Sequence, residues 1–328
     1  MRKWFQLFRA QTGFATVYTV AIPYLLAGGN PRNLAWIIPL SLLTHYASFG
    51  HNSVMDYWHD VRDPHKRHHP LVSGAISLGR AHQAIHTMLV VAGALWVLAA
   101  LYVSPVPHLA VSALLLHALL GHAYNDGLDK HTIHSWAPIS LCYVALSAFG
   151  WFLASPRIDV LFALLLIVAF SSIFYQIAFE GNLKEICIEE NLLTKLAEEV
   201  NCTTYNSTVI SYRGPKFGWL RMFFDTVVLT TMVVLEGSMM PLFIVVPFTI
   251  IQAILITAMN RKLVEGIDRN QLLEYFGLIE AIQFFRILGL VATDLWSLTL
   301  CLGLIVLGAS YFYLMNKWLW GSKWGPRV

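Results

Sequence analysis

The feature that most constrains the fold is a series of apolar runs, each long enough, or nearly so, to cross a lipid bilayer. A helix rises about 1.5 Å per residue, so about 20 apolar residues cross a hydrocarbon core of about 30 Å, and tilting absorbs shorter runs. The runs lie near residues 13–29, 34–50, 83–103, 107–123, 136–154, 158–179, 218–236, 240–259 and 289–314. They predict an all-α fold, a polytopic membrane bundle of about nine transmembrane helices.

The composition indicates the same class of protein. Of the 328 residues, 57% are apolar and 12% are charged, whereas a soluble domain usually carries about twice that share of charge. These values exclude a disordered chain, a coiled coil and an ordinary soluble enzyme, and we expect no nucleic-acid partner. The four cysteines form no CxxC pair, so their spacing indicates neither a zinc site nor a disulfide framework.

The stretch 272–288 is ambiguous. Glu274, Glu280, Gln283 and Arg286 interrupt it, and a charge at the centre of a bilayer is costly. We therefore expect an amphipathic helix on the membrane surface rather than a tenth span. The three basic residues of the C-terminal tail fit this topology poorly, because only ten spans would return them to the inside.

The charged loops predict the orientation. With the N-terminus inside, most of the 22 Lys and Arg residues fall in inside loops, and the outside loops hold only Arg32 and Arg157. Because basic loops stay in the cytoplasm, the long polar loops and their chemistry are expected to face the cytoplasm. Asn201-Cys-Thr and Asn206-Ser-Thr fit the glycosylation pattern, but they lie in an inside loop and we interpret them as chance matches.

A first acidic cluster lies where the second span meets the cytoplasm. Asn52, Asp56 and Asp60 are four residues apart, which places them on one face of a helix. One carboxamide and two carboxylates form a set of hard oxygen ligands suited to Mg²⁺. The alternative interpretation is a solvated helix end facing the lipid headgroups.

Basic and aromatic residues near this cluster suit a phosphate group. Arg62, Lys66 and Arg67 follow the first cluster, and they serve either as a positive-inside anchor or as ligands for phosphate oxygens. Tyr124 and Lys130 follow the fourth span at the same membrane face. They either bind a leaving diphosphate or belong to a plain hairpin loop.

A second acidic cluster follows the sixth span. Asn182, Glu185 and Glu189 have i, i+3, i+7 spacing, and Lys184 lies between them. Two such faces at the ends of even-numbered spans can meet across the mouth of a bundle and hold Mg²⁺ against a diphosphate. A charged surface helix is the alternative. The histidines His82 and His86 are also i, i+4, but no Glu or Cys completes a ligand set beside them, so we expect an interfacial pair.

These motifs resemble those of the UbiA superfamily of intramembrane prenyltransferases. That family has N-x-x-x-D-x-x-x-D at the end of its second span, and this chain has NSVMDYWHD there. The family tends to show R-P-L-x-S-G before its third span, where this chain has His69-Pro-Leu-Val-Ser-Gly74. The second family motif is typically D-x-x-D-x-x-x-D, and here Asn and Glu replace every Asp at the same spacing. Tyr124 and Lys130 resemble a Tyr/Lys element with longer spacing.

The resemblance implies one UbiA-like domain over residues 1–328, with a central cavity and motif loops near 52–80, 124–135 and 180–217. The implied cofactor is Mg²⁺. Its implied ligands are Asn52, Asp56, Asp60, Asn182, Glu185 and Glu189. The implied diphosphate contacts are Arg62, Lys66, Arg67, Tyr124, Lys130 and Lys184. The residues expected to act in catalysis are Asp56, Asp60, Glu185, Glu189, Tyr124 and Lys130.

The resemblance further implies transfer of an isoprenyl group from a polyprenyl diphosphate, through an allylic carbocation, to a lipophilic or phosphorylated acceptor in the bilayer. The spacing from Asp60 to Pro70 looks like that of the phosphoribose branch of the family, but an aromatic acceptor remains open. Two other functions also remain open. One is a terpene cyclase or prenyl diphosphatase on the same scaffold, and the other is a cation- or proton-coupled transporter.

Overall fold

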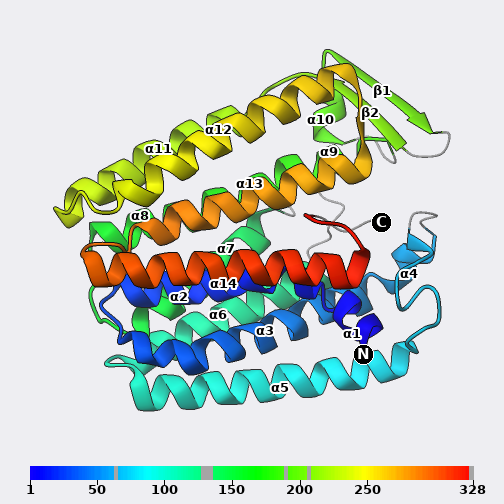
Figure 1. Ribbon diagram of the computed structural model, residues 1–328. Helices are drawn as coiled ribbons and strands as arrows, with labels where there is room; N and C mark the ends of the chain where they lie inside the picture. The colour runs from blue at the N-terminus through cyan, green and yellow to red at the C-terminus, as the bar shows by residue number, and fades with distance from the viewer. Residues whose placement is uncertain (63–65, 127–135, 188–190, 205–207, 325–328) are drawn as a thin grey trace.

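The protein is a bundle of long helices that run side by side (Figure 1). The computed structural model describes residues 1–62, 66–126, 136–187, 191–204 and 208–324. Within these residues, ten helices have 14 or more residues. They are α2 (Gly13–Leu26), α3 (Leu34–Met55), α5 (Leu78–Val103), α6 (Pro107–Asp126), α7 (Trp136–Phe152), α8 (Val160–Tyr175), α11 (Phe217–Glu236), α12 (Leu242–Glu265), α13 (Arg269–Gly289) and α14 (Leu295–Trp320).

The bundle belongs in a membrane. Five of the described helical stretches are long and apolar enough to cross a bilayer, namely 78–103, 160–185, 217–236, 242–265 and 295–320. Large apolar side chains such as Leu101, Leu119, Phe223, Phe243 and Val306 are exposed on the outside of the bundle. In water this surface would be unfavourable, whereas in lipid it is the expected surface of a membrane protein.

The core is formed by tightly packed helices around α2 and α7. Trp96, Phe149 and Trp151 are among its largest fully buried side chains. At Gly150, an added Cβ atom would lie 2.4 Å from the carbonyl oxygen of Val20, so α2 and α7 approach each other where only glycine fits. This close contact fixes two of the helices that surround the site.

The structure corrects the prediction for residues 272–288. Instead of lying on the membrane surface, α13 runs inside the bundle beside α12 and α14 (Figure 1), and Arg286 is 0% exposed. Gln283 and Arg286 form hydrogen bonds with partners on α12 and α11, which lowers the cost that argued against a span. The final helix, α14, begins at Leu295, and its last turn lies beside α1, where Arg2 donates a hydrogen bond to the carbonyl oxygen of Leu319 (Figure 1).

Short elements cover that end of the bundle. They are the helices α1 (Arg2–Leu7), α4 (Tyr57–Asp60), α9 (Asn182–Glu185) and α10 (Leu192–Leu196), the 3-10 turn η1 (Ala10–Thr12) and the π-helix η4 (Gln176–Gly181). A further 3-10 turn, η2 (Pro31–Asn33), precedes α3. A small antiparallel sheet, in the order β1-β2-β3, comprises Glu199–Thr204, Thr208–Arg213 and Ile267–Asp268.

A disulfide ties this sheet to the helical bundle. Cys187, two residues beyond α9, is bonded to Cys202 on β1. The cysteine spacing did not indicate a disulfide framework, and the structure corrects that interpretation for this pair. The two residues are 15 positions apart, and no local sequence motif indicates that they pair.

Candidate functional site

Described residues of both acidic clusters line the same large cavity. Its volume is about 1660 Å³, and Asn52, Asp56, Asp60, Asn182 and Glu185 all line it. These residues come from the end of the bundle that carries α4 and α9 (Figure 1). The cavity continues between the helices, where Leu89, Trp96, Leu114 and Leu146 are among its apolar lining residues.

The first cluster keeps the geometry that its spacing predicts. Asn52 lies in the last turn of α3, and its Nδ2 donates a hydrogen bond of 2.9 Å to Oδ2 of Asp56. Asp56 ends α3 and starts the short helix α4, which ends at Asp60. Asp60 is 5% exposed and forms an ion pair of 3.4 Å with Lys66.

Asp60 and its partner Lys66 are largely shielded from water. Burial raises the pKa of the Asp60 carboxyl above its usual value, although the Lys66 ammonium acts in the opposite direction. Burial and then the charge of Arg9 lower the pKa of Lys66. Burial, followed by the charges of Lys66 and Arg9, lowers the pKa of His69 to about 4, so this cavity-lining imidazole is neutral at pH 7.

The second cluster lies where η4 continues into α9. Nδ2 of Asn182 donates to the carbonyl oxygen of Ala178 at 2.8 Å, and Glu185 pairs with Lys184 at 3.3 Å. Asn191 caps α10 and donates to the carbonyl oxygen of Asn182 at 2.9 Å, which fixes this turn. Glu189, the last predicted ligand, lies outside the described residues.

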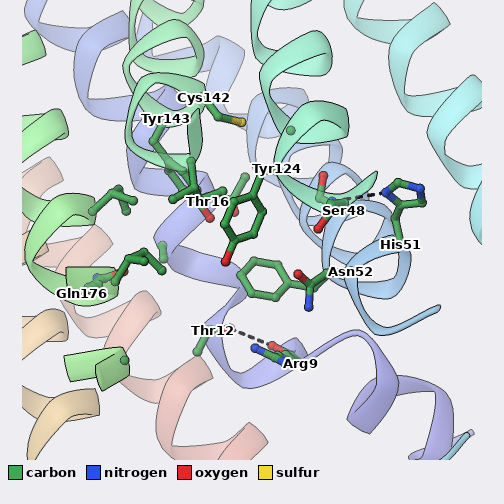
Figure 2. Close-up of a pocket in the computed structure, with 18 of the residues that line it drawn as sticks. Arg9, Thr12, Thr16, Ser48, His51, Asn52, Tyr124, Cys142, Tyr143 and Gln176 are labelled. Carbon is green, nitrogen blue, oxygen red and sulfur yellow. Dashed lines mark hydrogen bonds between the residues drawn. The ribbon is translucent and has the colours of Figure 1, made fainter. Parts of the chain in front are cut away.

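The predicted diphosphate contacts divide into three groups. Arg62, Lys66 and Lys184 line the cavity, and Figure 2 shows Tyr124 pointing from α6 into the space that Asn52 also lines. Arg67 is exposed and is not among the cavity-lining residues. Lys130 lies outside the described residues.

Two basic residues at this site were not predicted from the sequence. Arg9, between α1 and η1, lines the cavity with its guanidinium carbon 5.7 Å from the centre of the Phe49 ring (Figure 2). Arg269, at the start of α13, is 8% exposed, and its Nε donates to the carbonyl oxygen of Lys184 at 3.2 Å. Within the described residues its Nη1 has no hydrogen-bond partner. The sequence offered no signal beyond a basic residue beside an apolar run.

The side-chain oxygen atoms suit a hard metal ion that is also bound by the phosphate groups of a substrate. Within the described part of the chain, no three His, Cys, Asp or Glu side chains form a ready metal cluster. Mg²⁺ does not need one, because it is usually held by one or two carboxylates together with substrate phosphates and water. Carboxylates and carboxamides from both clusters line the cavity, and the residues therefore fit Mg²⁺ by donor type.

The histidines near the mouth of the cavity contact one another. The Nε2 atoms of His82 and His86 are 3.2 Å apart, and the ring of His51 stacks on that of His122 at 6.1 Å between centroids. His51 and His86 also line the cavity. The His82–His86 contact agrees with the interfacial pair that the sequence predicts.

These features define a class of protein: a membrane helix bundle in which two oxygen-rich motifs and several cations line one end of a deep, mostly apolar cavity. The profile of the UbiA prenyltransferase family matches residues 15–186, which is just over half of the chain. The protein belongs to the UbiA prenyltransferase family.

Solved structures with a similar fold include a UbiA homolog from Archaeoglobus fulgidus bound to Cd²⁺, with a TM-score of 0.54 and 14% identity over 88% of this chain and 99% of that chain. A UbiA homolog from the same organism bound to GPP and Mg²⁺ has a TM-score of 0.48 and 14% identity, over 95% and 99% of the two chains. A structure of digeranylgeranylglyceryl phosphate synthase has a TM-score of 0.47 and 14% identity, over 96% and 98%. A comparison with curated proteins finds no match.

Proposed function

We propose that the protein transfers an isoprenyl group from a polyprenyl diphosphate to a lipophilic or phosphorylated acceptor, in a reaction that requires Mg²⁺. The observation that carries the proposal is the convergence of two motifs, 130 residues apart at Asn52 and Asn182, on one cavity with an apolar interior. A prenyl diphosphate has the matching form, since its head is a polyanion and its tail is a long hydrocarbon. Membership of the UbiA family supports the same activity.

The polar end of the cavity suits the leaving group. Asn52, Asp56 and Asp60 on one side and Asn182 and Glu185 on the other would hold Mg²⁺. The metal would neutralise the negative charge that builds up on the diphosphate as the allylic carbon–oxygen bond breaks.

The protein's own cations would add direct contacts to the diphosphate. Lys66 and Lys184 are the central pair, because each one pairs with a motif carboxylate and lines the cavity. The Tyr124 hydroxyl and the Arg62 guanidinium offer hydrogen-bond donors to the same space. We place Arg9 and Arg269 in this set as well, since both guanidiniums line the cavity beside the two motifs.

The apolar part of the cavity would take the prenyl chain. Its lining residues, including Leu89, Trp96, Leu114 and Leu146, exclude water from the chain and from the allylic cation. Aromatic side chains such as Phe49 and Phe284 also line it, and their ring faces favour a cation.

The test uses purified full-length protein with labelled geranylgeranyl diphosphate, Mg²⁺ and a panel of phosphorylated and aromatic acceptors. Asp56→Ala should lower diphosphate release at least about 100-fold, the usual cost of losing a group that stabilises developing charge. The matched control is Glu265→Ala, an exposed acid outside the cavity. The proposal is wrong if the wild type neither binds the labelled diphosphate nor releases diphosphate, and Asp56→Ala changes nothing.

We also propose that the mouth of the cavity faces the cytoplasm. The basic residues Arg2, Lys3 and Arg62 lie at that end, and Lys317 now joins them because α14 ends beside α1. A single cysteine introduced at Lys3, in a background in which Cys142, Cys187, Cys202 and Cys301 are all replaced, should react with an impermeant thiol reagent only in inverted vesicles. Reaction in intact cells would place the mouth outside and overturn the proposal.

A further inference from the structure

The helix α13 carries polar side chains into the interior of the bundle. Glu280, Gln283 and Arg286 follow one another at three-residue intervals, and each has hydrogen-bond partners on other elements. Charged groups inside a membrane bundle are costly, and those that are present often serve a functional site. Gln283 and Arg286 have partners on α11 and α12, whereas Glu280 also reaches η4, the π-helical turn that leads into the second motif.

The Glu280 carboxylate links η4 to α11. Nε2 of Gln176, the first residue of η4, donates a hydrogen bond to Oε2 of Glu280. Arg221 on α11 donates to both oxygens of the same carboxylate, and its Nε also pairs with Asp225 at 3.3 Å. A carboxylate has acceptor sites for both donors at once, which a carboxamide does not.

A second contact joins α13 to the segment that carries the second motif. Nε of Arg269, at the start of α13, donates to the carbonyl oxygen of Lys184 at 3.2 Å. The contacts at Gln176 and Lys184 lie on either side of Asn182 in the sequence. Nδ2 of Asn182 in turn donates to the carbonyl oxygen of Ala178 within η4 at 2.8 Å. Helix α13 thus holds this segment at two points, one before and one after the first residue of the motif.

The backbone between these two contacts has an unusual conformation. Gln176–Gly181 form the π-helix η4, and α9 follows it directly. π-helical turns are rare and are found mostly at functional sites, because the wider turn changes which side chains share a face. Gln176 and Asn182 both line the cavity, and Figure 2 includes Gln176 among the residues around it. A change in this turn would therefore move Asn182 and Glu185 relative to the first motif.

Arg221 acts on this contact from outside the cavity. It is buried, with its guanidinium carbon 4.6 Å from the centre of the Tyr175 ring, and it is not among the cavity-lining residues. Of its two carboxylate partners, Glu280 lines the cavity and Asp225 does not. An effect of Arg221 on ligands in the cavity therefore has to pass through a neighbouring side chain, and Glu280 is suited to transmit it.

We propose that Glu280 is a positioning residue for the second motif. Backed by Arg221, it holds η4 through Gln176, and so fixes where Asn182 and Glu185 meet the metal ion and the diphosphate. The inference rests on the proposed prenyl transfer and adds a residue outside both motifs to its metal site. Replacing a residue that orients metal ligands from behind typically weakens metal binding by about 10–100-fold.

The test measures metal binding directly, with Mn²⁺ in place of Mg²⁺ and a slowly ionising thio analogue of geranyl diphosphate. Electron paramagnetic resonance of free Mn²⁺ gives the Kd of each full-length variant, and thermal unfolding gives its stability. In Glu280→Gln a single acceptor oxygen faces two donors, so one of the two contacts is lost. We expect the Kd for Mn²⁺ to rise about 10-fold or more. Gln176→Leu, which leaves the pair of Arg221 and Glu280 intact, should show a similar rise with little loss of stability.

Asp225→Asn is the matched control. Asp225 pairs with the same guanidinium, but its other hydrogen bonds go to Ser171 and Gln283, neither of which belongs to η4. This variant should be less stable than the wild type while its Kd for Mn²⁺ stays unchanged. The double variant Gln176→Glu with Glu280→Gln exchanges the carboxamide and the carboxylate, which again places a donor opposite an acceptor. It should bind Mn²⁺ more tightly than Glu280→Gln alone.

The possible results separate positioning from the alternatives. If Asp225→Asn weakens Mn²⁺ binding as much as Glu280→Gln does, these contacts act only on stability and the inference is wrong. Weaker binding in Glu280→Gln but not in Gln176→Leu also overturns it, since Glu280 would then bind the metal itself. Equal binding by the wild type and all variants overturns this inference alone. A wild type that binds no Mn²⁺ in the presence of the analogue contradicts the proposed function, and the inference with it.

Discussion

At residue 9 the backbone takes a conformation that an arginine adopts only at a cost. Arg9 has φ of 47°, and among the described residues it is the one non-glycine residue with positive φ. Its carbonyl oxygen accepts hydrogen bonds from Thr12 and His45, which hold the bend. Strained residues of this kind cluster at functional sites, and here the bend brings a guanidinium to the cavity.

The substitution Arg9→Gly tests separately the backbone strain at residue 9 and the contribution of the Arg9 side chain to diphosphate binding. Glycine adopts this conformation freely, so we expect the free energy of unfolding to hold or to rise by about 1 kcal/mol. The KM for the prenyl diphosphate should rise about 10-fold or more, since one charge-assisted contact is lost. Thermal unfolding and steady-state kinetics measure the two effects. The exposed Lys3→Gln is the control, and an unchanged KM in Arg9→Gly would remove Arg9 from the diphosphate site.

At the scale of single elements, α13 is the helix whose position was predicted wrongly from the sequence. Apolar runs located most helices within a few residues, as 107–123 against Pro107–Asp126 illustrates. The same reasoning placed 272–288 on the membrane surface, because a single segment does not reveal that Gln252 and Thr226 lie opposite Arg286. Spacing within one helix predicts a shared face, but partners 34 or 60 positions away become visible only once the chain has folded.

Buried polar contacts, from Arg221 to Glu280 and from Gln283 to Asp225, should hold α11 and α13 together. Asp225 is 0% exposed and accepts hydrogen bonds from Ser171, Gln283 and Arg221. Asp225→Asn leaves Arg221 with Glu280 as its remaining carboxylate partner, so we expect a loss of about 1–3 kcal/mol in stability. Thermal unfolding in detergent checks this.

The control for that measurement is Glu265→Gln, which breaks the exposed Arg261–Glu265 pair. Exposed pairs of this type contribute less than about 1 kcal/mol. Equal melting temperatures for the two variants would mean that these buried polar contacts do not stabilise the packing of α11 against α13.

The Cys187–Cys202 disulfide should stiffen the second motif. It closes a 15-residue separation directly after α9, and the chain-entropy estimate for such a loop is about 3 kcal/mol. Reduction should lower the melting temperature and raise the Mg²⁺ concentration needed for half-maximal diphosphate binding, because Asn182 and Glu185 become less ordered. Cys187→Ser should show both changes without reductant and no further change with it. Identical melting curves before and after reduction would argue against this role.

At the scale of the whole molecule, the site depends on two stretches that the sequence identifies separately. The spacing of Asn52, Asp56 and Asp60 predicted a shared face, and all three line the cavity. The size of the cavity and the π-helical turn η4 were not predictable, because both depend on how helices distant in sequence pack. Arg67 was predicted at the site from its position in a basic run, but its side chain is exposed beyond the cavity lining.

Mg²⁺ and the prenyl diphosphate should stabilise the molecule only as a pair. A ligand that binds the folded state at 100 times its Kd stabilises it by about 2.7 kcal/mol. We therefore expect a higher melting temperature when geranylgeranyl diphosphate and Mg²⁺ are both present, and loss of the increase on adding a chelator. Restoration by Mg²⁺ but not by Na⁺ completes the measurement. An increase that survives chelation would show that the lysines and arginines suffice without metal.

The helix α1 and the end of α14 lie side by side at the end of the bundle that carries α4 and α9 (Figure 1). A soluble enzyme fused before α1 or after α14 would therefore sit on the side from which water-soluble precursors arrive. If that partner produced a prenyl diphosphate, its product would be released within a short tether of the entrance, and the fusion would act as a two-step assembly at the membrane surface.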